Sequence, residues 1–157
     1  MIDDIDRKIL NILQNNARTP NAEVARQVGM APSAVFERIK KLEKKGVILG
    51  YEARINPQAL DLGLVAYTSV LSEEQVGCTD AGARLAEIEE VQEVHYTAGR
   101  DYYLIKARVK NTESLAGLLQ KFGQVQGIRD TRTTIVLSTI KETTCLPVFG
   151  QQDKEQE

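Results

Sequence analysis

Tryptophan is absent from this chain, and its 157 residues include only one histidine and two cysteines. His95 has no cluster of Cys, His or carboxylate residues at ligand spacing, which favours a structural role over a metal-binding or catalytic one. Cys78 and Cys145 are far apart and have no such partners either. We therefore expect reduced thiols, no metal site and no cofactor.

Sequence motifs of the common enzyme classes are also missing. The chain has no Gly-rich phosphate loop, no nucleophile elbow and no metal-spaced cluster. No apolar run approaches the roughly 18 residues of a transmembrane helix. The first residues are acidic, whereas a secretory signal begins with basic and then apolar residues. These patterns predict a cytoplasmic protein that is not an enzyme.

What the chain does contain is an uneven distribution of charge. Residues 1–57 hold ten Lys and Arg against seven Asp and Glu, a local net charge of +3, whereas the remainder holds ten against fifteen, a net charge of -5. Basic charge gathered on one segment attracts a polyanion, because each neutralised phosphate releases condensed counterions. The excess is modest, so useful DNA affinity is expected to need two or more copies on spaced half-sites.

The basic segment has the apolar periodicity of three helices. Residues 3–16 predict a first helix, and residues 22–28 a second helix with Asn21 as its N-cap. Gly29 supplies a left-handed turn before a third helix over residues 32–45. A short helix, a turn and a longer cationic helix make a helix-turn-helix, whose second helix lies in the major groove of DNA.

The third predicted helix, within PSAVFERIKKLEKKGVILGY, is the most informative segment. Val35, Ile39 and Leu42 recur at helical spacing and are expected to face the core, which leaves the opposite side of the helix for solvent. Phe36 is interpreted as a core residue in preference to a contact with a thymine methyl group. A solvated lysine-rich surface helix is the alternative for this segment when it is considered without its neighbours.

Residues 47–55 alternate loosely around Gly50, which predicts a two-stranded wing that contacts the flanking phosphates. Residues 56–63, with Pro57 and a Gly step, are typical of a linker between domains.

A second pattern follows the linker. It predicts a strand, a helix, two strands, a helix and a strand, at residues 64–71, 79–88, 91–98, 103–109, 112–122 and 128–140. Thr112 is expected to cap the second of these helices. This order is the split βαβ, ferredoxin-like arrangement, in which two helices cover one face of the sheet. The fold class is therefore α+β, with a winged helix-turn-helix followed by a ferredoxin-like domain.

The first predicted strand of this domain is apolar on both sides. Leu64, Ala66 and Val70 alternate with Val65, Tyr67 and Leu71, so neither side is suited to water. A second sheet is the simplest cover for the face that the helices leave open. We therefore expect an obligate homodimer.

Four segments of the chain resemble a known family. The runs IDDIDRKILNILQNNARTPNAEVARQVGM, PSAVFERIKKLEKKGVILGY, TAGRDYYLIKARV and GIRDTRTTIVLSTIK are similar to the leucine-responsive (Lrp/AsnC) transcriptional regulators of bacteria and archaea. The resemblance implies dimers that assemble into larger rings such as an octamer, and small effectors, often amino acids, bound near interfaces. With the sequence patterns above, we expect a DNA-binding domain over residues 1–55, a linker over 56–63, a ligand-binding and oligomerisation domain over 64–142, and a C-terminal extension over 143–157 whose polar last residues are disordered.

Candidate DNA-binding residues combine the exposed helix face with the family's usual contact positions: Ser33, Ala34, Glu37, Arg38, Lys40 and Lys41. Arg38 is the leading candidate for base readout, because its guanidinium can donate two bonds to guanine. Glu37 suits cytosine N4, with an ion pair to Lys41 as its structural alternative. The lysines are expected to contact phosphates.

Candidate effector-binding residues follow from the family's turn and final strand: Gly99, Arg100, Asp101, Tyr102, Thr131, Arg132 and Thr133. In the family an acid usually stands one place later in the turn than Asp101 does here. A shift of one place turns a side chain to the other face of a strand, so the contact to a ligand's ammonium group is expected to change. The structural alternatives are a solvated turn and a half-exposed edge strand.

Two other functions fit the same two-domain architecture. Some haem-precursor decarboxylases resemble this family, but they use histidines and arginines around an anionic macrocycle, whereas His95 is the only histidine here. An amino-acid sensor that does not bind DNA is the other alternative, and retention of Arg38, Lys40 and Lys41 disfavours it.

Overall fold

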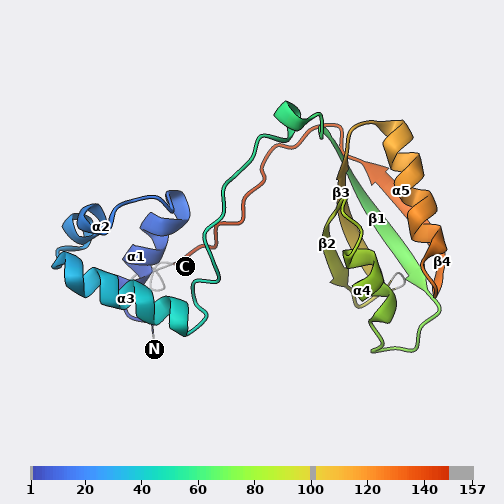
Figure 1. Ribbon diagram of the computed structural model, residues 1–157. Coiled ribbons are helices and arrows are strands. Elements are labelled where there is room, and N and C mark those ends of the chain that lie inside the picture. The colour runs from blue at the N-terminus through green and yellow to red at the C-terminus, as the bar shows by residue number, and fades with distance from the viewer. Residues whose placement is uncertain (1, 100–101, 149–157) are drawn as a thin grey trace, which may run out of the picture. The chain divides into compact units, whose positions relative to one another are not determined.

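The computed structural model describes residues 2–99 and 102–148 of the chain. The chain divides into two compact units, Met1–Arg54 together with Glu142–Glu157, and Ile55–Lys141. The C-terminal segment therefore returns to the first unit after the second unit is complete, which sequence patterns do not reveal (Figure 1). Among the described residues, no helix is long and apolar enough to cross a membrane.

The first unit is built on three helices, α1 (Asp4–Asn15), α2 (Asn21–Val28) and α3 (Pro32–Lys44). Each contributes one apolar stripe to a common core, as the periodicity predicted. The buried members of this core are Ile9, Leu13, Val24, Ala25, Val35 and Ile39.

The helix ends follow from local chemistry. α1 begins with a capping box, in which Asp3 accepts a hydrogen bond from the backbone of Asp6 and the Asp6 side chain accepts one from the backbone of Asp3. Gly29 has a φ of 70° and ends α2 in the left-handed conformation that the sequence predicted. The prediction that Asn21 caps α2 is wrong, because Pro20 is the N-cap and Asn21 is the first helical residue. The Pro20 side chain has no hydrogen-bond acceptor, so the helix begins without a side-chain cap.

The two-stranded wing predicted over residues 47–55 does not form in the described chain. The backbone amides of Val47 and Ile48 both bond to the carbonyl of Leu42 and so belong to the end of α3. Residues 49–56, which follow, have no regular secondary structure, and the Leu49 side chain is 94% exposed. Too few residues remain on the near side of Gly50 to pair as a strand.

The second unit contains a short 3-10 helix, η1 (Pro57–Leu60), and one four-stranded sheet with two helices. Its elements are β1 (Leu64–Ser72), α4 (Asp80–Ala86), β2 (Val91–Tyr96), β3 (Tyr103–Val109), α5 (Thr112–Gln124) and β4 (Ile128–Ile135). The strands lie in the order β2-β3-β1-β4, and every neighbouring pair is antiparallel. This confirms the predicted ferredoxin-like topology.

Several predicted boundaries move inward. The final strand ends at Ile135 rather than at residue 140, and α4 is shorter than the predicted helix at 79–88. Asn111, rather than Thr112, caps α5, because its side chain accepts a hydrogen bond from the backbone of Ser114.

Both helices pack on the same face of the sheet. Side chains of α4 and α5, such as Leu85 and Phe122, share one core with Ala66 and Ile105 of the central strands. At Gly82 of α4 an added Cβ would lie 2.5 Å from the buried ring of Tyr103, so only glycine allows this approach.

Candidate nucleic-acid interface and effector region

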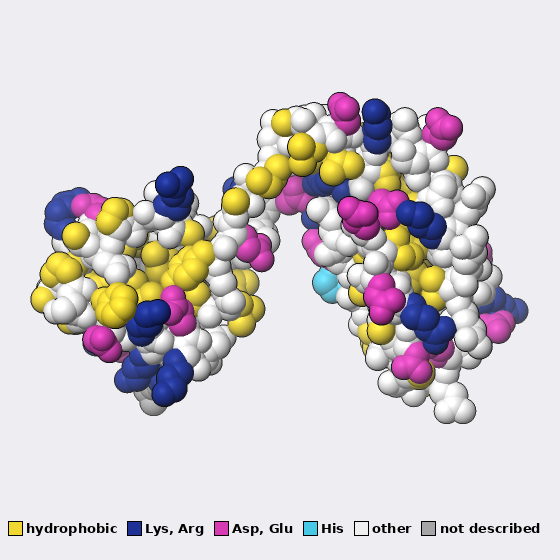
Figure 2. Space-filling model, viewed as in Figure 1, with side chains coloured by type: hydrophobic (Ala, Val, Ile, Leu, Met, Phe, Trp, Pro, Cys, Tyr) yellow, Lys and Arg dark blue, Asp and Glu magenta, His cyan; other side chains and the backbone are white. Residues whose placement is uncertain are grey.

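The outward face of α3 carries most of the predicted DNA-binding side chains. Val35, Ile39 and Leu42 are buried on one side of the helix. The opposite side presents exposed Ser33, Glu37, Lys40, Lys41 and Lys44, with Ala34 half-buried beside them. Figure 2 shows Lys and Arg side chains gathered over this helix. Lys44, which is also exposed, extends the basic face by one turn.

Arg38 occupies a different position from these residues. Its Nη1 atom donates to the carboxylate of Asp3 across 2.6 Å and to that of Asp6 across 2.7 Å. The Arg38 side chain is 29% exposed and that of Asp6 only 13%. The guanidinium therefore lies on the flank of α3 that faces the start of α1, and it is already paired within the unit. The predicted role in base readout competes with this ion pair.

The capping box of α1 positions this pair. It holds the Asp3 and Asp6 carboxylates side by side at the first turn of α1, where both can accept from one guanidinium. The backbone amide of Asp6, and next the Arg38 guanidinium, lower the pKa of Asp3. Hydrogen bonds to Asp3 and then to Asp6 raise the pKa of Arg38 above its already high value. The arrangement ties the start of α1 to α3.

Phe36 lies on the other flank of α3 and is not a core residue, contrary to the prediction. Its side chain is 44% exposed, and the Lys40 ammonium stands 5.6 Å from the centre of its ring. Phe36 lines a shallow open hollow of about 240 Å³ together with Leu13 and Tyr51. The periodicity failed here because Phe36 falls just outside the stripe that Val35 and Ile39 define.

The predicted effector residues that the structure describes lie on separate elements of the sheet. Gly99 and Tyr102 flank the turn between β2 and β3, while Arg100 and Asp101 of the same turn lie outside the described residues. Thr131, Arg132 and Thr133 lie on β4. β2 and β4 are the two opposite edges of the sheet. At the start of β3, Tyr103 pairs with Val70 of β1, which in turn pairs with Thr131 of β4, so the strand β1 separates the two groups.

The three β4 residues also point to different faces of the sheet. Thr133 pairs with Thr68, and their hydroxyl groups are 2.9 Å apart on the helix-covered side. Thr131 shares that side, since it pairs with the buried Val70. Arg132 pairs with Ser69 and lies on the open face.

An aromatic contact links the turn between β2 and β3 to the loop before α4. The rings of Tyr96 and Tyr102 stack with centroids 6.3 Å apart. The hydroxyl oxygen of Tyr96 accepts a hydrogen bond from the backbone amide of Gly77. Tyr102 therefore packs against Tyr96, which in turn is bonded to the loop before α4.

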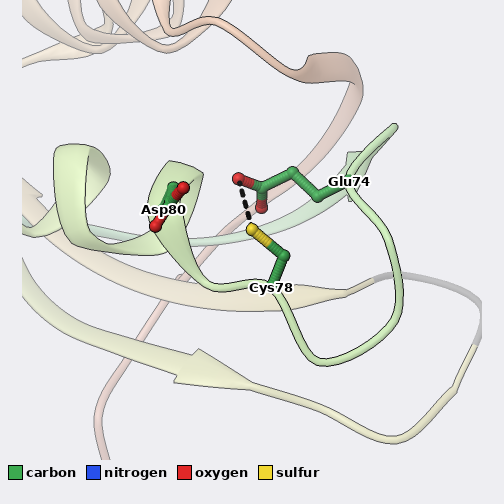
Figure 3. A group of neighbouring side chains, drawn as sticks. All are labelled: Glu74, Cys78 and Asp80. Atoms are coloured by element: carbon green, nitrogen blue, oxygen red, sulfur yellow. Dashed lines mark hydrogen bonds between the residues drawn. The ribbon is translucent and has the colours of Figure 1, made fainter.

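The same loop brings together Glu74, Cys78 and Asp80, whose ligand atoms lie within 4.8 Å of one another (Figure 3). The Glu74 carboxylate already accepts from Tyr103, Ala81, Ser72 and Cys78. Burial tends to raise the pKa of Glu74, but the hydrogen bonds led by that from Tyr103 outweigh it and leave the pKa lowered. Glu74 thus acts as a structural acceptor at the start of α4.

Comparison with known proteins covers both units. Residues 2–48 match the winged helix-turn-helix DNA-binding family, and residues 66–146 match the Lrp/AsnC ligand binding domain. The HTH-type transcriptional regulator FL11 of Pyrococcus abyssi is 39% identical over 148 residues, which cover 94% of this chain and 97% of that protein. The leucine-responsive regulatory protein of Haemophilus influenzae is 39% identical over 149 residues, which cover 92% and 89% of the two chains.

Solved structures agree with this result. A transcriptional regulator from Neisseria meningitidis in complex with L-methionine superposes with a TM-score of 0.87 at 31% identity, covering 94% of this chain and 97% of the other. The feast or famine regulatory protein of M. tuberculosis, also with L-methionine, gives 0.86 at 36% identity, with coverage of 93% and 99%. Since both domain matches occur in the family's order and relatives align along nearly the whole chain, the protein belongs to the Lrp/AsnC family of transcriptional regulators.

Proposed function

We propose that this DNA-binding regulator reads its operator with α3 through Ser33, Ala34, Glu37, Lys40 and Lys41. The observation that carries this proposal is the exposed cationic face of α3, whose reverse side is anchored in the core by Val35, Ile39 and Leu42. A helix anchored in this way can enter the major groove without losing its packing.

The chemistry of each side chain suggests its role. Lys40 and Lys41 suit phosphate oxygens as point charges, and Lys44 extends the same row. Glu37 is exposed and suits cytosine N4, whereas Ser33 and Ala34, at the first turn, suit close approach to base edges or backbone. Arg38 is assigned to hold α3 against α1 through Asp3 and Asp6, with base readout as the alternative that the tests below address.

The effector is proposed to be an amino acid, because related regulators have been solved with L-methionine. Gly99, Arg100, Asp101 and Tyr102 would supply one part of the site, and a second copy's β4, with Thr131, Arg132 and Thr133, the other. This division is supported by the position of β1, which lies between β3 and β4 and keeps the described residues of the two groups on separate strands. The effector site would then exist only in an assembly.

A homodimer is proposed to form through the open face of the sheet, followed by a ring such as an octamer. Tyr67 and Leu104 stand on this face, each 38% exposed, which is unusual for apolar side chains at the centre of a sheet. Burial of such area contributes roughly 25 cal/mol per Å². Effector binding between copies would shift the population of assemblies, and hence the spacing of the two α3 helices. We place this activity in the cytoplasm and assign no enzymatic role.

Binding selection on random DNA fragments, repeated with each amino acid and at several salt concentrations, tests the proposal. The expected product is a palindromic site whose half-sites are separated by about one or more helical turns, with affinity that falls steeply with salt. One amino acid is expected to alter the affinity or the preferred spacing. A selected pool without a common sequence would overturn the assignment of readout to α3, and an absence of any response to amino acids would overturn the effector proposal alone.

A further inference from the structure

The segment after β4 is bound to the DNA-binding unit. Gln14 of α1 contacts Leu146 with both ends of its amide: Nε2 donates to the Leu146 carbonyl across 3.1 Å, and Oε1 accepts from the Leu146 backbone amide across 2.7 Å. Three residues earlier on the same helix, the Asn11 amide donates to the carbonyl of Val148 across 3.0 Å. Two side chains of α1 thus hold two alternate residues of the segment.

These bonds define the path of the segment. Residue 146 lies at Gln14 and residue 148 at Asn11, so the backbone runs along α1 in the direction opposite to the helix. The thiol of Cys145 donates to the carbonyl of Gln14 across 3.5 Å, which adds a contact at the same level of the helix. The helix face used here is the reverse of the stripe formed by Ile9 and Leu13, so docking does not disturb the core.

Main-chain groups, rather than apolar side chains, hold the segment. The Leu146 side chain is 71% exposed and contributes little burial, whereas both polar groups of its backbone are satisfied by one residue. Specificity for an extended peptide therefore lies in the spacing of the two amides on α1. A hydropathy pattern carries no trace of such a site, because the bonds to Leu146 and Val148 use only their main-chain groups.

The segment also gives the chain a second crossing between its units. The first crossing follows Arg54 and the second follows Lys141. At the level of the crossings, the Arg54 guanidinium donates to the carbonyl of Glu142 across 3.5 Å. Two units joined at one point rotate freely about it, whereas a second attachment restricts that rotation.

We propose that α1 carries a docking surface for the chain's own C-terminal segment, and that residues 142–148 form a strap which ties the end of β4 to the DNA-binding unit and limits its rotation. Through residues 136–141, the strap is joined to the strand that carries Thr131, Arg132 and Thr133. Its effect on DNA spacing rests on the proposed binding to paired half-sites. Its docking on α1 does not.

Amide hydrogen exchange measured by NMR on the full chain tests the docking. Gln14→Ala removes both bonds to Leu146 and is compatible with a helix, since Ala has the highest helix propensity. Gln14→Glu keeps an acceptor for the Leu146 amide but loses the donor to its carbonyl. Asn15→Ala is the matched control, because the Asn15 amide donates to the carbonyl of Asn11 within α1 and forms no hydrogen bond with the described residues of the strap.

The Leu146 amide is expected to exchange roughly fivefold or more faster in Gln14→Ala, as the loss of a hydrogen bond predicts. Gln14→Glu is expected to lie between this variant and the wild type, and Asn15→Ala to match the wild type. Exchange of the wild-type Leu146 amide at the rate of an unstructured peptide would overturn the docking. Equal rates in the wild type and Gln14→Ala would do the same.

A second measurement tests the restriction of rotation. Affinity is compared between a selected two-half-site fragment and the same fragment with about five base pairs inserted, which turns the half-sites to opposite faces of the DNA. The insertion is expected to weaken binding by the wild type and by Asn15→Ala, and to weaken binding by Gln14→Ala at least about threefold less. If the insertion weakens binding by Gln14→Ala as much as binding by the wild type, the strap does not restrict rotation. If the insertion leaves wild-type affinity unaltered, the proposal of paired half-sites fails. The docking of the strap on α1 is then judged from the exchange rates alone.

Discussion

The Arg38 guanidinium on α3 donates to the Asp6 carboxylate on α1 across 2.7 Å, and the two side chains are 29% and 13% exposed. A charge pair so little exposed is screened less by solvent than one on the open surface, and removal of one partner leaves the other charge partly buried.

Arg38→Ala is expected to destabilise the DNA-binding unit by about 1–3 kcal/mol, because it removes charge-assisted hydrogen bonds to both Asp6 and Asp3. Urea denaturation measures this change. Binding selection with the same variant is expected to return the wild-type base preference with reduced overall affinity. If Arg38→Ala keeps the wild-type stability but loses its preference at one base position, Arg38 reads a base instead. Arg26→Ala is a suitable control, since Arg26 makes an exposed ion pair with Glu23 elsewhere in the unit.

Lys40→Ala and Lys41→Ala are expected to weaken DNA binding by a similar factor for every sequence. Each removes one phosphate contact, so the slope of log K against log salt should fall in magnitude by about 0.9 for each substitution. Lys110→Ala serves as the control, because Lys110 lies in the other unit beside Asp61. A substitution at Lys40 that alters base preference while leaving the salt slope intact would contradict the assignment to phosphates.

Gly29→Ala is expected to lower the free energy of unfolding by about 1–2 kcal/mol. The φ of Gly29 is 70°, a conformation that penalises any side chain, and an added Cβ would meet no atom within 4 Å. The loss of stability is therefore expected to come from backbone conformation and not from a steric clash. Gly50→Ala is the matched control, because it has equal space but no positive φ. Thermal or urea unfolding of the two variants should differ by that amount, and equal stabilities would contradict the turn's requirement for glycine.

Stability at alkaline pH is expected to depend on Tyr103. Burial, together with its hydrogen bond to Glu74, raises the pKa of the Tyr103 phenol to about 12, compared with about 10 in an unfolded chain. Below pH 10 both states keep the proton and the contribution is complete. Between pH 10 and 12 the unfolded state loses its proton first, so stability falls as the pH rises.

Tyr103→Phe is expected to lose part of its stability at neutral pH, about 1 kcal/mol, because the Glu74 carboxylate loses a donor. The difference in unfolding free energy between wild type and variant should narrow from pH 10 to 12. The ultraviolet difference spectrum of the two proteins should show the extra phenolate appearing near pH 12. A constant difference across this range would contradict the raised pKa.

The sequence by itself determined the elements and their order. The helical spacing of Val35, Ile39 and Leu42 reflects only the side of the helix that each residue faces. The glycine at position 29 is required by the local backbone conformation. The ferredoxin-like topology followed from the alternation of strand and helix patterns, and the confirmed family resemblance rests on several motifs in the right order. These features are local, so a linear pattern records them.

Tertiary structure alone decided how the side chains pair. The engagement of Arg38 by Asp3 and Asp6, and the capture of Leu146 by Gln14, join residues separated by 35, 32 and 132 positions. Polar groups without a repeating period give no sign in the sequence of which partner will satisfy them. The same reason explains why residues 47–55 form no wing and why Phe36 is exposed. Whether such residues are paired or buried depends on the side chains and strands that the folded chain places next to them.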